Sequence, residues 1–436
     1  MKIYLSIITL IILSIIFNIF NYTYFTSLLS ITWYIASILI LYISIKYTYK
    51  LKFIQIRISK IIEAIKSKSK NNITPLSSLS ISLAAKIGVG SLSGVALCLY
   101  FGGLGSFFWL SIISILVSVN TYLECILGMK YREKYNNKYI GGPSYYISKC
   151  LKNNKLGILY GILIIITYSG LFLSIQSNTI VNTLGYYNIN KIYISLIIFI
   201  ITLIIVLKGT KGIFKVNSIL VPIMLIFYLL IGIYITFNNF DILSIIFKRV
   251  LKEAFRIKSI VPVFLIGMQR AIFITESSLG TSAISSSTCD NEPQKQAMLE
   301  VLGIHIVTFI VCFTTFIIIS TTDYYLIDFG NLNGIEIVIY AFNYHFGKIG
   351  TLLLTIITIL FAFSTIISSY FFGESNLKIV SNNKIMKYIF IIFFMIIIIL
   401  SCFIKPNILW NLCDYFIAII AIINTYSIIK ILKIKE

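Results

Sequence analysis

The stretch from Ile81 to Ala96 combines two properties that point to a ligand site. It is apolar enough to cross a membrane, yet Gly88, Gly90 and Gly94 interrupt its middle. Glycine weakens a helix, and in lipid a broken helix is tolerated only where its freed N–H and C=O groups face protein or water. The segment therefore predicts a binding site at a helix break. The alternative is a helix thinned for close packing, because small residues also mediate helix contacts in lipid.

A second apolar segment, residues 260–286, is interrupted in a similar way. Its middle holds Thr275, Glu276, Ser277, Ser278, Gly280, Thr281 and Ser282. Broken helices at corresponding positions of two inverted halves are the sequence pattern of a transporter's midplane site. The second break thus favours the binding-site interpretation of the first.

The composition indicates a polytopic helical membrane protein. Of the 436 residues, 58% are hydrophobic and only 12% are charged, and the mean hydropathy is +0.95. Lys and Arg outnumber Asp and Glu by 36 to 15, but the charges gather between apolar segments, as orientation in a membrane requires, and do not suggest nucleic acid. The 7 cysteines show no CxxC spacing, which argues against a disulfide framework or a metal site.

We expect an all-α fold of about twelve transmembrane helices. The predicted spans are 3–20, 28–48, 78–101, 104–129, 157–182, 191–207, 217–237, 260–286, 299–320, 344–372, 386–404 and 410–432. The first span has no small-residue cleavage site after it, so we interpret it as a retained helix and not a signal peptide. Residues 1–75 then form a two-helix prelude with a basic linker. Residues 76–240 and 241–436 form two five-helix repeats, the second inverted because five is odd.

Charge predicts the orientation. Basic residues cluster at 46–70, 130–155, 208–215 and 430–435, all on one side if the spans alternate, so that side and both termini are expected in the cytoplasm of a cell membrane. The loop with Asp323, Asp328 and Glu336 then falls outside. One basic group also falls outside, namely Lys248, Arg249, Lys252, Arg256 and Lys258. An amphipathic helix lying on the outer surface would explain it.

Several motifs in register resemble the alanine or glycine:cation symporter family. They are GVGSLSGVA (88–96), GGLGSFFW (102–109), KYRE (130–133), GGPSYYI (141–147), QSN (176–178), VPIMLIFYLLIG (221–232), QRAIFITESSLGTSA (269–283) and LFAFSTIISSYFFGE (360–374). The similarity covers nearly everything after about residue 35. It implies a leucine-transporter-type fold of two inverted five-helix repeats, and sodium-coupled import of small neutral amino acids such as alanine or glycine, with no organic cofactor.

The chain departs from the family pattern at positions that bear on the substrate and the ion. Val89 replaces a hydroxyl residue and Ser91 an amide in the first break, and Thr275 replaces an Asn in the second. Val307 stands where an Asp is common, and Ser369 where a Trp is common. These differences leave the fold assignment unchanged.

The resemblance implies a substrate site at the two breaks. A carboxylate suits backbone N–H groups at a half-helix N-terminus, which Val89, Gly90 and Ser91 would supply. The ammonium group would bind carbonyl oxygens freed between Phe273 and Thr275, and the Phe273 ring would close over a small side chain.

Two further polar positions are candidates for substrate contact. Gln176 and Asn178 lie at membrane depth, where polar groups usually have a reason to be, although hydrogen bonding between helices is an alternative. If Ser369 lines the pocket, the loss of a Trp leaves room for a larger side chain. Ser369 facing another helix, or Phe371 filling the gap, is the alternative.

The resemblance also implies a sodium site. Sodium is a hard cation that takes oxygen ligands, as other hard cations do. The carbonyls of Ala84 and Ile87 and the side chains of Ser364 and Thr365 could serve, and the Phe361 carbonyl lies one helical turn before Thr365 on the same face. From spacing alone, bonding of the two hydroxyls back to their own helix is favoured, as Ser and Thr in membrane helices more often do.

Charged residues inside the spans require partners. Glu276 could tie its broken helix together, pair with Arg270, or relay a proton. Lys86 could neutralise Glu276 or Glu124, and a cation at this position could also weaken sodium binding.

The leading interpretation is a sodium-coupled symporter whose partners are a small neutral amino acid, sodium and the lipid bilayer, with no nucleic acid and no protein partner implied. The alternatives are proton coupling or another amino-acid substrate on the same fold, and a non-transporting amino-acid sensor. An enzyme is disfavoured because the sequence holds no HExxH, no GxSxG at a turn and no paired intramembrane aspartates.

Overall fold

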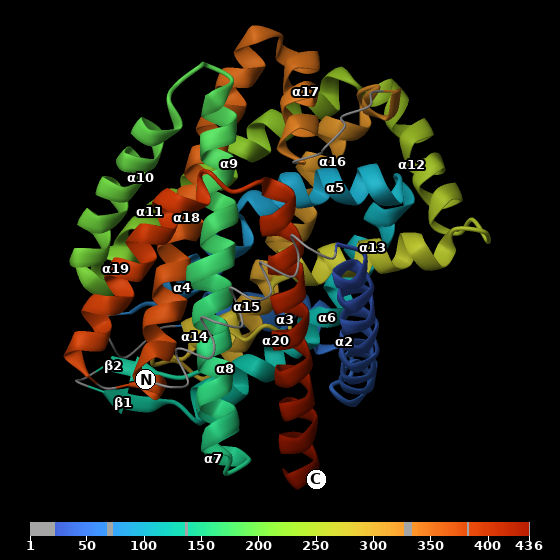
Figure 1. Ribbon diagram of the computed structural model, residues 1–436. Helices are drawn as coiled ribbons and strands as arrows, with labels where there is room; N and C mark the ends of the chain where they lie inside the picture. The colour runs from blue at the N-terminus through green and yellow to red at the C-terminus, as the bar shows by residue number, and fades with distance from the viewer. Residues whose placement is uncertain (1–21, 68–72, 136–137, 327–333, 382, 436) are drawn as a thin grey trace.

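A computed structural model of the chain describes residues 22–67, 73–135, 138–326, 334–381 and 383–435 (Figure 1). Among these residues, 8 helices are long and apolar enough to cross a membrane, and one further helix pair, Pro75–Lys86 with Val89–Gly102, is bent by 56°. Lys191–Leu207 and Ile260–Thr275 are shorter apolar helices. The predicted span 3–20 lies outside the described residues, so the count of about twelve stays a prediction.

The long helices up to residue 238 overlap the predicted spans from 28–48 to 217–237, and several short helices lie between them. They are α2 (Tyr22–Lys50), the short η1 (Ile54–Ile56), α3 (Ile58–Ile65), α4 (Pro75–Lys86), the 3₁₀ turn η2 (Val89–Ser91), α5 (Ser93–Gly102), α6 (Gly105–Lys130), α7 (Pro143–Cys150), α8 (Asn154–Ile166), the π-helical η3 (Thr167–Phe172), α9 (Leu173–Gly185), α10 (Lys191–Leu207) and α11 (Gly209–Asn238). A small hairpin that the sequence did not predict, β1 (Glu133–Tyr135) paired antiparallel with β2 (Lys138–Ile140), precedes α7.

The remaining elements contain the second break. They are α12 (Phe240–Ala254), α13 (Ile260–Thr275), α14 (Thr281–Ser286), α15 (Pro293–Ile306), the π-helical η4 (Val307–Cys312), α16 (Phe313–Ser320), η5 (Tyr324–Leu326), α17 (Ile335–Phe346), α18 (Lys348–Val380), α19 (Lys384–Ser401) and α20 (Pro406–Lys435). The predicted span 344–372 merged the end of α17 with α18. Gly347 separates them, since its φ of 58° takes the chain out of the helix.

The two breaks differ in backbone geometry. At the first, Gly88 is extended, with φ −65° and ψ −167°, between the end of α4 and η2. At the second, three residues between α13 and α14 adopt positive φ: Glu276 at 52°, Ser278 at 68° and Gly280 at 77°. Because L-residues with side chains rarely adopt this region, the second break needs strong support from its surroundings.

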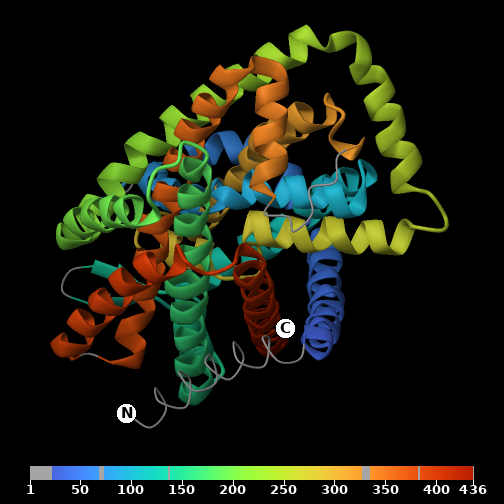
Figure 2. The same ribbon diagram turned by 45° about the horizontal axis from the view of Figure 1, so that its top comes forward.

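Two halves of the broken helices, α5 and α13, run side by side across the molecule (Figures 1 and 2). In Figure 1 the hairpin, α7 and the C-terminal end of α20 lie at the lower end of the molecule, whereas α12 and α17 lie at the upper end. The basic group at 248–258 begins in α12, so the predicted helix in this loop is confirmed. Its Leu243, Ile246, Val250 and Ala254 are buried, while Lys248 and Lys252 are exposed.

Candidate functional site

The first break is built around a close approach at Gly88. A Cβ on Gly88 would lie 2.4 Å from Thr365 Oγ1 of α18 and 3.1 Å from Gln176 Oε1 of α9. Only glycine leaves space for both polar side chains beside the backbone. The break thus brings α4, α9 and α18 together at one point.

Two of the three predicted carboxylate-binding N–H groups, those of Val89 and Ser91, already have partners inside the protein. Val89 N–H donates to Gln176 Oε1 at 3.0 Å, and Ser91 N–H donates to Gly88 O at 3.0 Å. The Ser91 hydroxyl also donates to Gly88 O, at 2.8 Å. Gln176 Nε2, however, is buried and has no hydrogen-bond partner among the described residues. Gln176 therefore offers an unused donor beside the break, suited to an oxygen of a ligand.

Phe273 packs directly on the first break. A Cβ on Gly90 would lie 2.9 Å from Phe273 Cε1, so the glycine accommodates this ring. On its other sides Phe273 stacks with Phe172 of η3, at 5.3 Å between ring centroids, and contacts Trp410 of α20, at 5.1 Å. The three rings form a layer over the break, consistent in position with a cover for a small side chain.

Thr275 and Ser369 have other contacts. The Thr275 hydroxyl donates back to Ala271 O at 2.7 Å. Ser369 O accepts a hydrogen bond from Ser169 Oγ of η3 at 3.0 Å, and Ser369 Oγ is buried without a partner among the described residues. Asn178 donates to Ser401 O and Ile404 O, at 2.8 and 2.9 Å, and so joins α9 to the α19–α20 connection.

Four of the five predicted sodium ligands are joined by hydrogen bonds, two of which are the bonds back to the helix that the spacing favoured. Thr365 Oγ1 donates to Ala84 O at 2.7 Å and to Phe361 O at 2.9 Å, so it bridges α4 and α18. Ser364 Oγ also donates to Phe361 O, at 2.9 Å. Ile87 follows the last turn of α4, and its N–H donates to Leu83 O. These buried carbonyl and hydroxyl oxygens are the neutral, hard ligands that suit an alkali cation.

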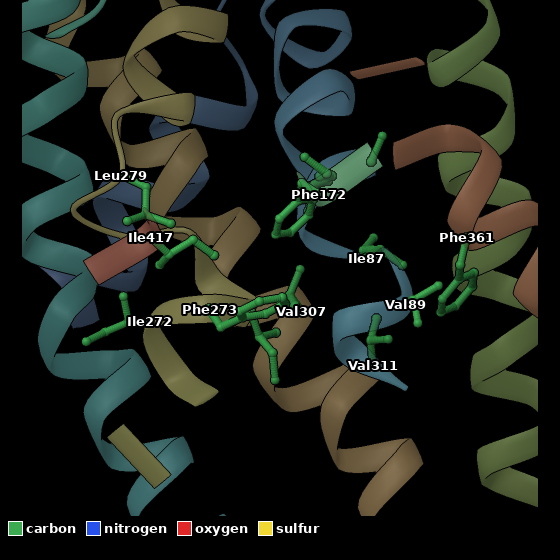
Figure 3. Close-up of a cluster of buried hydrophobic side chains, with 14 of the residues drawn as sticks. Ile87, Val89, Phe172, Ile272, Phe273, Leu279, Val307, Val311, Phe361 and Ile417 are labelled. Atoms are coloured by element: carbon green, nitrogen blue, oxygen red, sulfur yellow. The ribbon is translucent and has the colours of Figure 1, made fainter. Parts of the chain in front are cut away.

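Apolar side chains surround the first break (Figure 3). Val89 lies between Phe361 of α18 and Val311 of η4, and Val307 lies beside Phe273. All of them are buried. The departures Val89 and Val307 thus extend an apolar wall at positions where the family pattern is polar.

Lys86 has a different partner from the two that the sequence suggested. Its Nζ lies 3.3 Å from Glu300 Oε2 of α15, and neither side chain is exposed. Lys86 also donates to Ser282 Oγ of α14, at 2.8 Å, and to Ser82 Oγ. Glu300 is therefore the ion-pair partner of Lys86. Within the described residues no salt bridge joins Lys86 to Glu276 or Glu124, although its charge acts on both carboxyl groups through space.

Arg270 likewise pairs elsewhere than with Glu276. Arg270 Nη2 lies 2.9 Å from Asp414 Oδ2 of α20, and Gln269 Nε2 donates to the same oxygen at 3.1 Å. The Arg270 guanidinium also lies over the Phe273 and Trp410 rings, at 5.6 and 5.5 Å. Sequence reasoning missed Asp414 and Glu300, although an acidic residue within an apolar span was a usable signal.

The second break is held by carboxylates. Glu124 Oε2 of α6 accepts from Gly280 N–H at 3.1 Å, and Glu124 Oε1 accepts from Asn424 Nδ2 at 3.0 Å. Asn424 donates to Ser278 O as well, at 3.0 Å. Glu276 Oε2 accepts from the Thr281 hydroxyl at 2.7 Å, which closes the break on itself as one alternative had it.

Comparison with known proteins identifies the family to which the chain belongs. The family model described as the sodium:alanine symporter family matches residues 18–435. The chain belongs to the sodium:alanine symporter family. It is 29% identical over 411 residues to a Bacillus subtilis protein named "Probable sodium/glutamine symporter GlnT", covering 91% of this chain and 85% of that protein. It is 25% identical over 376 residues to the sodium/alanine symporter AgcS of Methanococcus maripaludis, covering 83% and 82%.

A solved structure shows the same fold. The crystal structure of MhsT in complex with L-phenylalanine superposes with a TM-score of 0.54 at 15% identity, covering 83% of this chain and 99% of that one. This likeness concerns the fold alone. Together with the family assignment and the apolar helices, it makes this sodium:alanine symporter family member a multi-pass membrane protein of the amino-acid:cation symporter class.

Proposed function

We propose that the protein is a sodium-coupled symporter that imports a small neutral amino acid across a cell membrane by alternating access. The observation that carries the proposal is the position of Thr365, whose hydroxyl reaches both Ala84 O at the break and Phe361 O in α18. An ion bound among these oxygens would join the half-helix α4 to α18. Binding of the ion would then stabilise the geometry of the break.

The substrate would lie at the same break, next to Gln176. Its carboxylate would accept from Gln176 Nε2 and compete for the Val89 N–H that Gln176 Oε1 now occupies. Its side chain would face the layer of Phe273, Phe172 and Trp410. Ser91, Thr275 and Ser369 remain proposed contacts, which movement of η2, α13 or α18, respectively, would have to bring to the substrate.

The identity of the coupling ion is tested by measuring uptake of radiolabelled alanine, glycine, serine and glutamine into proteoliposomes. Either a sodium gradient or a proton gradient is imposed. We expect uptake to require sodium. The double variant Ser364→Ala with Thr365→Ala should lose most of the sodium dependence, while Thr365→Ser should retain it because it keeps the hydroxyl. Uptake driven equally well by protons alone, or a double variant that transports normally at low sodium, would refute the sodium assignment.

We further propose that the membrane orientation follows the charge distribution, with both termini and the β1–β2 hairpin in the cytoplasm and α12 outside. In Figure 1 the hairpin and the C-terminal end of α20 lie at the opposite end of the molecule from α12, which supports this orientation. The division at residues 75 and 240 into a prelude and two inverted repeats belongs to the same proposal. Impermeant labelling of Lys134→Cys and Lys252→Cys in intact cells tests the orientation. Only Lys252→Cys should react, and labelling of Lys134→Cys would reverse the assignment.

A further inference from the structure

One face of the helix α12 is buried against the rest of the protein. Leu243, Ile246 and Val250 are buried on it, and the helix packs against α6. Glu253 Oε2 accepts from Leu104 N–H at 2.7 Å and from Gly105 N–H at 3.4 Å, so α12 caps the start of α6. The helix is thereby fixed in position.

The opposite face and the following turn carry cations without protein partners. Lys248, Lys252, Arg256 and Lys258 are all exposed. No ion pair involves them within the part of the chain that the structure describes. Arg249 is different, since it lies 3.4 Å from Glu253 Oε1 and 5.3 Å from the Tyr325 ring centroid.

Large apolar side chains are exposed between these cations. The exposed fractions are 59% for Ile245, 53% for Leu251, 51% for Phe255 and 91% for Ile257. Cations interleaved with exposed apolar groups are typical of a helix that lies in the membrane interface. There the apolar groups reach the acyl chains and the basic groups reach phosphates.

We propose that the C-terminal part of α12 and the turn after it, together residues 248–258, form a binding surface for anionic phospholipid. The lysines and Arg256 would bind the headgroup phosphates, and Leu251, Phe255 and Ile257 would contact the acyl chains. A second copy of the chain fits less well, because two such faces would bring like charges together. That the lipid belongs to the outer leaflet rests on the proposed orientation; the binding chemistry does not.

The surface is mechanically connected to both broken helices. Trp109 Nε1 of α6 donates to Ala254 O at the end of α12, at 3.0 Å. Through Glu253, α12 also fixes the Leu104–Gly105 backbone that directly follows α5. The chain after the surface continues into α13, which carries Arg270 and Phe273. Lipid bound here would stabilise the positions of α5 and α13, one half of each broken helix.

The test is thermal unfolding of the purified full-length protein in detergent, with added 1-palmitoyl-2-oleoyl phosphatidylglycerol or the matching phosphatidylcholine. The test variant is Lys248→Gln with Lys252→Gln and Lys258→Gln. The control changes three exposed lysines elsewhere, Lys191→Gln, Lys348→Gln and Lys405→Gln, and so removes the same charge. Because the measurement needs neither transport nor orientation, its failure is distinguishable from failure of the proposed function.

We expect phosphatidylglycerol to raise the unfolding temperature of the wild type and of the control by several degrees more than phosphatidylcholine does. The test variant should lose this difference, and added salt should reduce it. Soluble glycerophosphoglycerol, which lacks acyl chains, should have no effect. Equal stabilisation by the two lipids in the wild type would overturn the proposal, as would an undiminished phosphatidylglycerol effect in the test variant. A lipid-independent dimer that the test variant abolishes would assign the surface to a second copy instead.

Discussion

The two helix breaks satisfy their freed backbone groups with different chemistry. At the first break, the Val89 N–H binds a neutral amide, Gln176 Oε1, and Ala84 O accepts from the Thr365 hydroxyl. At the second, the Gly280 N–H binds the carboxyl group of Glu124, and Glu124 is itself bound by Asn424. The first break therefore depends on neutral hydrogen bonds and the second on a buried acidic group.

This difference indicates which break exchanges ligands. A neutral hydrogen bond contributes only about 0.5–1.5 kcal/mol net, so a substrate or an ion can replace it at small cost. Glu124 instead accepts hydrogen bonds with both of its oxygens, and each buried donor left without that acceptor would cost about 1–3 kcal/mol. We infer that the first break is the exchangeable site and that the second is a fixed framework, although the sequence suggested a ligand at both.

The largest expected effect concerns the link between the breaks. Lys86 precedes the first break and binds Ser282 of α14 and Glu300 of α15. Lys86→Met leaves Glu300 buried and unpaired, which should destabilise the protein by about 3–5 kcal/mol. The double variant Lys86→Met with Glu300→Leu should recover most of this loss, because it removes both buried charges. Thermal unfolding in detergent measures the effect, and a double variant no more stable than the single one would contradict it.

The second-largest loss of stability is expected at the second break. Glu124→Ala removes the acceptor of Gly280 N–H and of Asn424 Nδ2, and each buried donor left without a partner costs about 1–3 kcal/mol. Glu124→Gln keeps one acceptor oxygen and should be intermediate in unfolding temperature. If Glu124→Ala unfolds at the wild-type temperature, the second break is not held by this side chain.

The first break should respond in transport more than in stability. A Cβ on Gly88 would lie 2.4 Å from Thr365 Oγ1, and overpacking of this kind costs about 1–3 kcal/mol. We expect Gly88→Ala to weaken sodium activation of uptake by about tenfold or more. Gly185→Ala is the matched control, since a Cβ on Gly185 would extend into open space. Equal sodium activation in the two variants would place the ion elsewhere.

The smallest effect is expected at Ser369. Its hydroxyl is buried without a partner among the described residues, so Ser369→Ala should be neutral or stabilise the protein by up to about 1 kcal/mol. Amino-acid preference in uptake should not change if Ser369 faces η3 throughout the transport cycle. A shift in the ranking of glycine, alanine, serine and glutamine would show that Ser369 contacts the substrate in another state.

The sequence by itself determined the apolar helices and where they break. The span 191–207 coincides with α10 because Asn190 caps the helix, accepting from Ile192 N–H, and Lys208 ends the apolar run. The span 217–237 was too short, since α11 starts at Gly209. Hydropathy marks the part of a helix that suits lipid, and the helical backbone continues through polar turns beyond it.

Only the tertiary structure determined which buried charged residues pair with each other. Arg270 and Asp414 are 144 residues apart, and Lys86 and Glu300 are 214 apart, so no local spacing relates them. A buried charge shows in a sequence as an acidic or basic residue within an apolar span, but its partner depends on which helices pack together. For the same reason the family resemblance suggested Thr365, Ala84 and Phe361 as candidates, whereas the packing of α18 against the break brought their oxygens within hydrogen-bonding distance.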